Sequence, residues 1–231
     1  MRRALVAVGV VCVALAAGAT RAGATNECRG LQVCVRVTGP WVVVPASGAR
    51  VEFQLACPRR YLVGGLDAEL SDRAIDISFV AKVGSPVAPG ITTSRKAVFV
   101  ATFVGSSRRA VTFRPHLGCV PANGAGGRIP TAATPVVPPG QPTVRRVRTL
   151  RVVPGRTRFV AAACASGERL VAGSHAVGFW TVRPPAARLV RAVVTRQSLA
   201  RDHVTVGAKG GAALGRVRAI VQVSAICAGG K

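Results

Sequence analysis

The chain contains the same cysteine-bounded unit twice. The first unit runs from Cys57 to Cys119 and the second from Cys164 to Cys227, so their cysteines are 62 and 63 positions apart. A related phrase follows each leading cysteine, Tyr61-Leu62-Val63-Gly64-Gly65 in one unit and Arg169-Leu170-Val171-Ala172-Gly173 in the other. A Val-Val-Pro turn precedes each unit. Repetition of this kind indicates a duplicated structural module and says little about chemistry.

The N-terminus has the pattern of a secretory signal peptide. Arg2-Arg3 form a charged start, Ala4 to Ala17 are apolar, and Ala22-Gly23-Ala24 resemble a cleavage site. We expect removal of residues 1–24 and a secreted protein, either extracellular or associated with the cell envelope. A retained leader acting as an anchor is the alternative, although the apolar run is short for a membrane span. No later stretch is long and apolar enough to cross a bilayer.

Cysteine usage predicts disulfides. Removal of Cys12 with the leader leaves an even number of cysteines, which in an exported chain is typical of disulfide bonding. No C-x-x-C or Cys/His cluster has zinc-site spacing. Closing a loop of about 60 residues contributes roughly 4 kcal/mol in the chain-entropy model. The duplication favours three pairs: Cys28–Cys34, Cys57–Cys119 and Cys164–Cys227.

Several segments read as strands with one apolar face. Val51 to Cys57, Val111 to Cys119 and Ala219 to Cys227 alternate, and each places its cysteine on the apolar face. Two inward cysteines from distant strands indicate a bridge across a β-sandwich core. Further strands are expected over Ile75–Val83, Ala97–Val104, Phe179–Val182 and Val204–Val206, while Ala186–Ala200 stays open between helix and strand.

The predicted fold class is therefore all-β, with two tandem disulfide-braced β-sandwich domains after a cleaved signal peptide. A segment rich in Pro and Gly between the two units cannot continue a sheet and reads as a linker. The expected division is 1–24 signal peptide, 25–120 first repeat, 121–142 linker and 143–231 second repeat.

Paired cysteines at this spacing resemble immunoglobulin-like sandwich repeats, and Trp180 follows Cys164 at about the distance where such domains place a core Trp. The first repeat has no matching Trp, and no Tyr stands two positions before Cys119 or Cys227. Cys57-Pro58 followed by Val63-Gly64-Gly65 is similar to a C-P…V-x-G-G phrase of exported, uncharacterised β-rich proteins of G+C-rich bacteria. That resemblance implies no activity.

The charge is strongly positive, with a formal net charge of +24. Such a surface attracts polyanions, and the bias of a G+C-rich gene toward Arg is a second explanation of the charge that can hold together with the first. Nucleic-acid binding would need aromatic residues interleaved with the charges, and these are missing, so no specific nucleic-acid partner is expected. We therefore expect contact with anionic wall polymers or lipid headgroups through Arg145, Arg146, Arg148, Arg151, Arg188 and Arg191.

Residues for catalysis are sparse, and we expect no enzyme and no cofactor. Nucleophile-elbow, zinc-protease, phosphate-loop and dinucleotide motifs are absent from the sequence. A hydrolase that combines Ser174, His175 and Asp202, or that uses His203, is the weakest alternative, because neighbouring strand residues point to opposite faces. His116, His175 and His203 are expected to be solvated polar residues.

The acidic residues Asp67, Glu69, Asp72 and Asp76 form the one acidic stretch of the chain. Their spacing matches no EF-hand, so a solvated turn is preferred over a calcium site. The functional prediction is an exported, non-enzymatic structural or binding protein with a basic surface. A specific protein-binding or adhesive module is the alternative.

Overall fold

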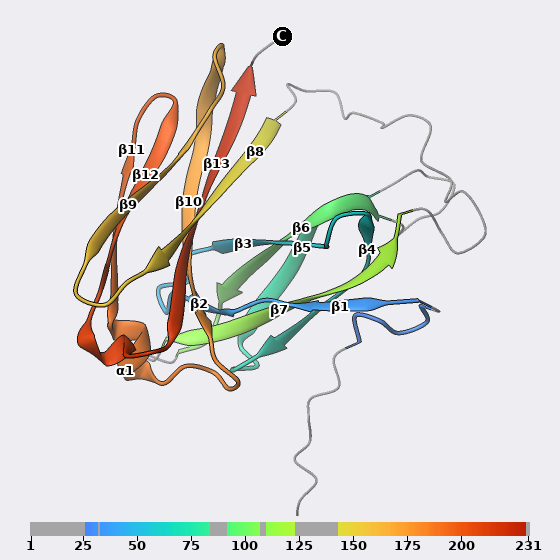
Figure 1. The fold of residues 1–231 in the computed structure, drawn as a ribbon, viewed down its shortest axis with the longest axis horizontal. Helices are drawn as coiled ribbons and strands as arrows, with labels where there is room; N and C mark the ends of the chain where they lie inside the picture. Colours follow the sequence, from blue (N-terminus) through green and yellow to red (C-terminus); the bar gives the residue numbers. More distant parts are fainter. Residues whose placement is uncertain (1–25, 32, 84–91, 107–109, 123–142, 230–231) are drawn as a thin grey trace, which may run out of the picture.

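The structure is a computed structural model that describes residues 26–31, 33–83, 92–106, 110–122 and 143–229. The expected signal peptide and almost all of the expected linker lie outside the described residues. The chain is nearly all β (Figure 1). The first half contains β1 (Val35–Thr38), β2 (Trp41–Val44), β3 (Val51–Ala56), β4 (Tyr61–Leu70), β5 (Ile75–Val83), β6 (Thr92–Phe103) and β7 (Val111–Pro121).

The second half begins with β8 (Thr143–Val152), directly after the expected linker. Its one α-helix, α1, has 5 residues, and no described helix has the length and apolar character that a membrane crossing requires. The remaining elements are β9 (Thr157–Ala163), β10 (Glu168–Trp180), α1 (Ala187–Arg191), β11 (Val193–Leu199), β12 (His203–Gly210), the 3-10 turn η1 (Ala212–Leu214) and β13 (Arg218–Gly229).

The strand pairing of the first half is repeated in the second. In the first half β7 pairs with β4 and with β1 and β2, while β6 pairs with β3 and β5. In the second half β13 pairs with β10 and β8, while β12 pairs with β9 and β11. All these pairs are antiparallel. The interrupted segment β1–β2 thus takes the place of the continuous strand β8, and the sequence duplication corresponds to a duplicated topology.

A β-bulge occurs at the same place in both halves. Val63 lies opposite Cys119 and Leu170 lies opposite Cys227, and the register shifts directly after each of them. A bulge inserts one extra residue into one strand of a pair. The structure therefore aligns Val63 with Leu170, one position away from the alignment that the matching letters suggest.

The three disulfides are Cys28–Cys34, Cys57–Cys119 and Cys164–Cys227, with Cα–Cα distances of 5.7, 5.8 and 5.6 Å. Each long-range bridge joins the end of β3 or β9, in a three-stranded sheet, to β7 or β13 in the large sheet. The cysteines at their ends are buried or half-buried beside the two apolar clusters. Alternation along the strands predicted the inward direction of Cys57, Cys119 and Cys227, while the apolar run before Cys164 made no prediction.

The halves share one sheet. Its strand order is β1-β7-β2-β10-β13-β8, with β4 on the other edge of β7. The connection is short, because β2 meets β10 only through Val42 opposite Gly178 and Trp41 opposite Phe179. Figure 1 shows β8, β10 and β13 running steeply across the direction of β1, β3 and β7. The second half therefore lies against the side of the first half and is joined to it by more than a linker.

Several local expectations need correction. The strand expected over Phe179–Val182 is instead the end of β10, which begins at Glu168 and stops at Trp180. The ambiguous segment Ala186–Ala200 contains both states, α1 followed by β11. Trp180 is 38% exposed beneath Arg218 and does not belong to the core around Cys227. β7 also continues one residue beyond the expected end of the first repeat at 120.

Candidate functional site

The open side of the first half, between β2 and β3, is covered by the second half. Ala176 of β10 and Ile220 of β13 belong to the apolar cluster of the first half, and Pro40 lies against Gly178. These residues lie on the face of β10 and β13 that points away from the second core. β13 was expected to expose this face, and it is buried because the first half packs against it.

In this contact between the two halves, which we call the joint, a glutamine side chain takes the place of a neighbouring strand. The Gln54 N–H of β3 donates to Gln222 Oε1 at 2.6 Å, and Gln222 Nε2 donates to the Gln54 carbonyl at 2.9 Å. Gln222 is only 7% exposed. A primary amide offers one acceptor and two donors, so it satisfies both backbone groups of an edge residue. The open edge of β3 is thereby closed without a further strand.

Arg145 is part of the same joint. Its Nη1 lies 2.6 Å from Glu52 Oε2 and 2.7 Å from the buried Ser224 Oγ. Glu52 also forms an ion pair with Arg50, with 2.8 Å between Glu52 Oε1 and Arg50 Nη2. Arg145 therefore acts between the two halves, and its charge is already compensated.

The second half keeps the equivalent side open. A cleft of about 410 Å³ lies between β8 and β9, and Lys96 of β6 in the first half also lines it. Its walls combine four basic side chains with a row of small residues. The lining residues are Lys96, Arg145, Arg146, Val147, Arg148, Ala161, Ala162, Ala163, Cys164 and Ala165.

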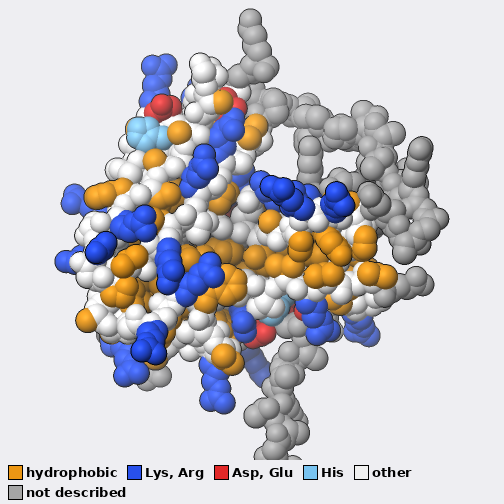
Figure 2. Space-filling model, in the orientation of Figure 1, with side chains coloured by type: hydrophobic (Ala, Val, Ile, Leu, Met, Phe, Trp, Pro, Cys, Tyr) orange, Lys and Arg blue, Asp and Glu red, His pale blue; other side chains and the backbone are white. Residues whose placement is uncertain are grey.

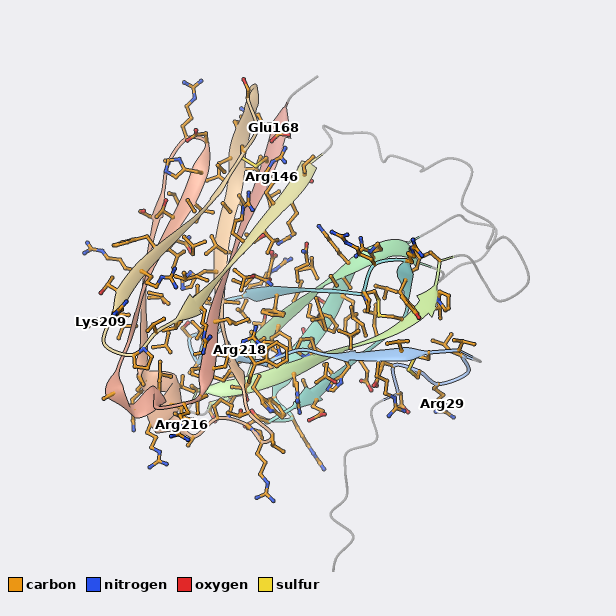
Figure 3. The ribbon with its side chains drawn as sticks, in the orientation of Figure 1. Arg29, Arg146, Glu168, Lys209, Arg216 and Arg218 are labelled. Carbon is orange, nitrogen blue, oxygen red and sulfur yellow. A yellow bond between two sulfur atoms is a disulfide. The ribbon has the colours of Figure 1, made fainter. Side chains whose placement is uncertain are left out.

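Glu168 stands at the end of this cleft and holds Arg146. Arg146 Nη2 donates to Glu168 Oε1 at 2.7 Å, Arg146 Nε donates to Oε2 at 3.1 Å, and the Ala165 N–H donates to Oε2 at 2.7 Å. The Arg146 hydrogen bonds, followed by the one from Ala165, lower the pKa of the Glu168 carboxyl below its ordinary value of 4.5. Figure 3 shows the two side chains together at the upper end of the second half.

The six arginines predicted to contact polyanions do not form one patch. Arg145 and Arg146 are occupied by Glu52 and Glu168. Alternation along β8 places Arg148 and Arg151 on opposite faces, and both are exposed without an ion pair to a described residue. Figure 1 shows α1 and the start of β8 at opposite ends of the second half. The exposed residues of α1 in this set are Arg188 and Arg191.

The acidic stretch does not converge on one point. The Asn26 N–H donates to Asp67, Glu69 lies 3.0 Å from His116, and the Ala74 N–H donates to Asp72. Among the described residues, no three of the carboxyls Asp67, Glu69, Asp72 and Asp76 bring ligand atoms within 4.8 Å of one another. The calcium alternative therefore has no geometry to support it.

One group of possible metal ligands does converge. It consists of Cys164, Cys227 and Glu168. Both sulfurs are bonded to each other in a disulfide, so neither is a thiolate, the form that binds metals. This grouping is consequently a structural link with a neighbouring carboxylate.

His116 is buried, which contradicts the expectation of a solvated residue. It is 4% exposed, with Nε2 3.0 Å from Glu69 and Nδ1 3.3 Å from the Thr38 hydroxyl. Glu27, which is 2% exposed, lies on the same face. It belongs to residues 26–31, here called the N-terminal segment, which cross the outer face of β4 and β7. Alternation along β7 identified the polar face correctly, and the N-terminal segment covers that face.

Ser174, His175 and Asp202, the residues of the alternative hydrolase site, do not contact one another in the arrangement that catalysis would need. His175 Nδ1 lies 2.6 Å from Gln197 and Nε2 lies 2.9 Å from Thr195, so both ring nitrogens contact β11. The exposed Asp202 instead pairs with the half-buried His203 at 2.7 Å, and this hydrogen bond is the main cause that lowers the Asp202 pKa. Ser174 is opposite Ser224 in the register and points away from His175.

Positive charge is distributed over the visible surface. Figure 2 shows Lys and Arg side chains over both halves and few acidic ones. Every acidic residue except Asp76 contacts a polar group of another described residue. The carboxylates are therefore mostly used within the fold, while many arginines are left facing solvent.

Comparisons with models of protein families, with curated proteins and with solved structures found no match to this chain. Its function must therefore be inferred from its own residues. The joint formed by Gln54 and Gln222, and the equivalent open cleft, were missed by the sequence reasoning. Superposing the two repeats at their cysteines aligns Gln54 with Ala161, but no feature of either residue type indicates a contact.

Proposed function

We propose that the chain is an exported, non-enzymatic protein of the cell envelope or extracellular space that binds anionic polymers through its basic surface. It consists of two tandem β-sandwich domains, each braced by its own long-range disulfide, and loses residues 1–24 as a signal peptide. Disulfides persist outside the cytoplasm, which is compatible with this location. Anionic wall polymers and lipid headgroups are the polyanions that such a protein meets first.

The observation that carries the proposal is the imbalance between internal and external charge. The chain has 32 Lys and Arg residues against 8 Asp and Glu residues, so the carboxylates can neutralise only a small part of the arginine charge. Arg148, Arg151, Arg188 and Arg191 are exposed and make no ion pair with a described residue. They lie on two different elements, β8 and α1, and do not form one patch, which favours an extended polymer over a small anion.

Binding of this kind is electrostatic and falls as salt screens the charges. The test uses immobilised polyphosphate and, separately, vesicles of phosphatidylglycerol, each washed with increasing sodium chloride. We expect retention at low salt that is lost at moderate salt. Arg188→Gln combined with Arg191→Gln should elute at clearly lower salt than the native protein.

The matched control removes an internal ion pair without changing the net charge. Arg146→Gln combined with Glu168→Gln should elute at the same salt concentration as the native protein. If the α1 variant elutes with the native protein, or if native protein is not retained at low salt, the proposal fails. Retention that resists salt and requires one particular protein would instead favour the alternative function, a specific protein-binding or adhesive module.

A further inference from the structure

The two halves treat the same strand edge differently. Cys57 and Cys164 occupy equivalent positions, so Gln54 in β3 is equivalent to Ala161 in β9. In the first half the backbone of Gln54 is occupied by the Gln222 side chain. In the second half Ala161 lines the open cleft.

The backbone polar groups of Ala161 point into this cleft. The Cys57 N–H donates to the Arg95 carbonyl at 2.8 Å, and the Cys164 N–H donates to the Asp202 carbonyl at 2.7 Å. The backbone groups of both cysteines therefore point toward the neighbouring strand of the same sheet, β6 or β12. In an antiparallel ladder, successive residues direct their N–H and C=O to opposite sides. Gln54 and Ala161 lie three positions earlier and therefore point outward. The Gln222 contact shows this direction directly for Gln54.

The cleft walls favour an acidic occupant. The small side chains of Ala161, Ala162 and Ala163 leave space beside the edge of β9. Across the cleft, β8 contributes Arg148, an exposed cation that forms no ion pair with a described residue. An unpaired strand edge is a template for adding another strand, and side-chain contacts then decide which strand binds.

We propose that this cleft binds an extended polypeptide segment with acidic side chains. Its backbone pairs with the N–H and C=O of Ala161, and one of its carboxylates pairs with Arg148. A peptide group supplies both a donor and an acceptor, as the Gln222 amide does at Gln54. Polyphosphate and other purely accepting polyanions cannot donate to the Ala161 carbonyl. The cleft therefore recognises the backbone of its ligand, which the polymer-binding surface does not, although Arg148 belongs to both.

The probe is a short, fluorescently labelled synthetic peptide with alternating Glu and Val residues, and its Kd is measured by fluorescence anisotropy at physiological salt. The second probe is the same peptide N-methylated on alternate residues, which keeps the charge but removes backbone donors. We expect the N-methylated peptide to bind at least about fivefold more weakly, since each net hydrogen bond is worth about 1 kcal/mol. Equal binding of the two peptides, or no binding of either, would overturn the proposal.

Protein variants test the two contacts separately. Ala161→Pro removes the N–H that faces the cleft and spares the ladder to β12, and proline is tolerated at such edge positions. We expect about fivefold weaker peptide binding with an unchanged β-rich circular dichroism spectrum. If this variant does not fold, the N-methylated peptide decides the question on the native protein.

Arg148→Gln should weaken peptide binding by about 1.5-fold to fivefold, the range for an exposed ion pair. Arg151→Gln is the matched control, because it lies on the other face of the same strand and should bind the peptide like the native protein. Equal effects of Arg148→Gln and Arg151→Gln would indicate charge alone and overturn the proposal. The variant with Arg188→Gln and Arg191→Gln should elute from polyphosphate at lower salt yet bind the peptide like the native protein. The two proposals can therefore fail independently.

Discussion

At the scale of single residues, Glu168 makes the stability of the protein depend on pH at the end of the cleft. Its pKa lies below 4.5 because Arg146 and the Ala165 N–H hydrogen-bond to the carboxylate. A carboxyl whose pKa falls on folding contributes stability that is present above its unfolded pKa. That contribution is lost as the pH falls from about 4.5 through the lowered folded value. The same contacts keep the Arg146 side chain in place at the cleft wall.

Glu168→Gln should therefore unfold at a lower temperature than native protein at pH 7, and the difference should shrink as the pH falls below about 4.5. Thermal unfolding followed by circular dichroism at several pH values between 7 and 3 measures this. Asp76→Asn serves as the control, because this exposed carboxyl has no ion pair to a described residue. A Glu168→Gln difference that stays constant across this pH range would contradict the prediction.

At the scale of elements, two glycines allow the N-terminal segment to lie on the large sheet. A Cβ atom at Gly65 of β4 or at Gly118 of β7 would collide with the Glu27 carbonyl. The contact is with backbone, so no side-chain rotation relieves it. The second glycine of the V-x-G-G phrase in the first repeat is thus explained by close packing. Ala172 and Ile226 occupy the equivalent positions in the second half.

Gly118→Ala should displace the segment around Glu27 and destabilise the protein by about 1–3 kcal/mol, the usual cost of overpacking. Urea unfolding gives the free energy, and hydrogen exchange near Glu27 should become faster. Gly211→Ala is the control, because an added Cβ there meets its neighbours at ordinary contact distance, 3.4 Å or more. Unchanged stability together with unchanged exchange near Glu27 would show that this contact is unimportant.

At the scale of the whole molecule, the halves share a sheet, an apolar cluster and the Gln222 joint. Such sharing favours one cooperative unfolding transition over two separate ones. The chain has two Trp residues, and Trp41 and Trp180 stand on opposite sides of the β2–β10 pairing. Trp41 lies opposite Phe179, and Trp180 follows Phe179 in β10, so the two Trp residues report on the two strands that form this pairing.

Single-Trp proteins carrying Trp41→Phe or Trp180→Phe should unfold in urea as single transitions, with the fluorescence and circular dichroism midpoints of each coinciding. Gln222→Ala, introduced into either background, should lower the free energy of unfolding by about 1–3 kcal/mol, because it leaves the Gln54 backbone groups unpaired. Gln54→Ala is the control, since it keeps those backbone groups and their partner. Transitions in which fluorescence and circular dichroism differ, or an effect of Gln222→Ala seen by one Trp alone, would indicate independent halves.

The sequence alone was sufficient for the β-rich class and the disulfide pairs, because spacing and alternation are local consequences of strand geometry. Val51, Phe53 and Cys57 all face the core as their alternation predicts. Which polar faces are buried was decided by tertiary structure, as Gln222, Ser224 and His116 show. Alternation identifies the polar side of a strand, but another segment determines whether that side meets water. The open cleft likewise exists because the second half has no further module to cover it among the described residues.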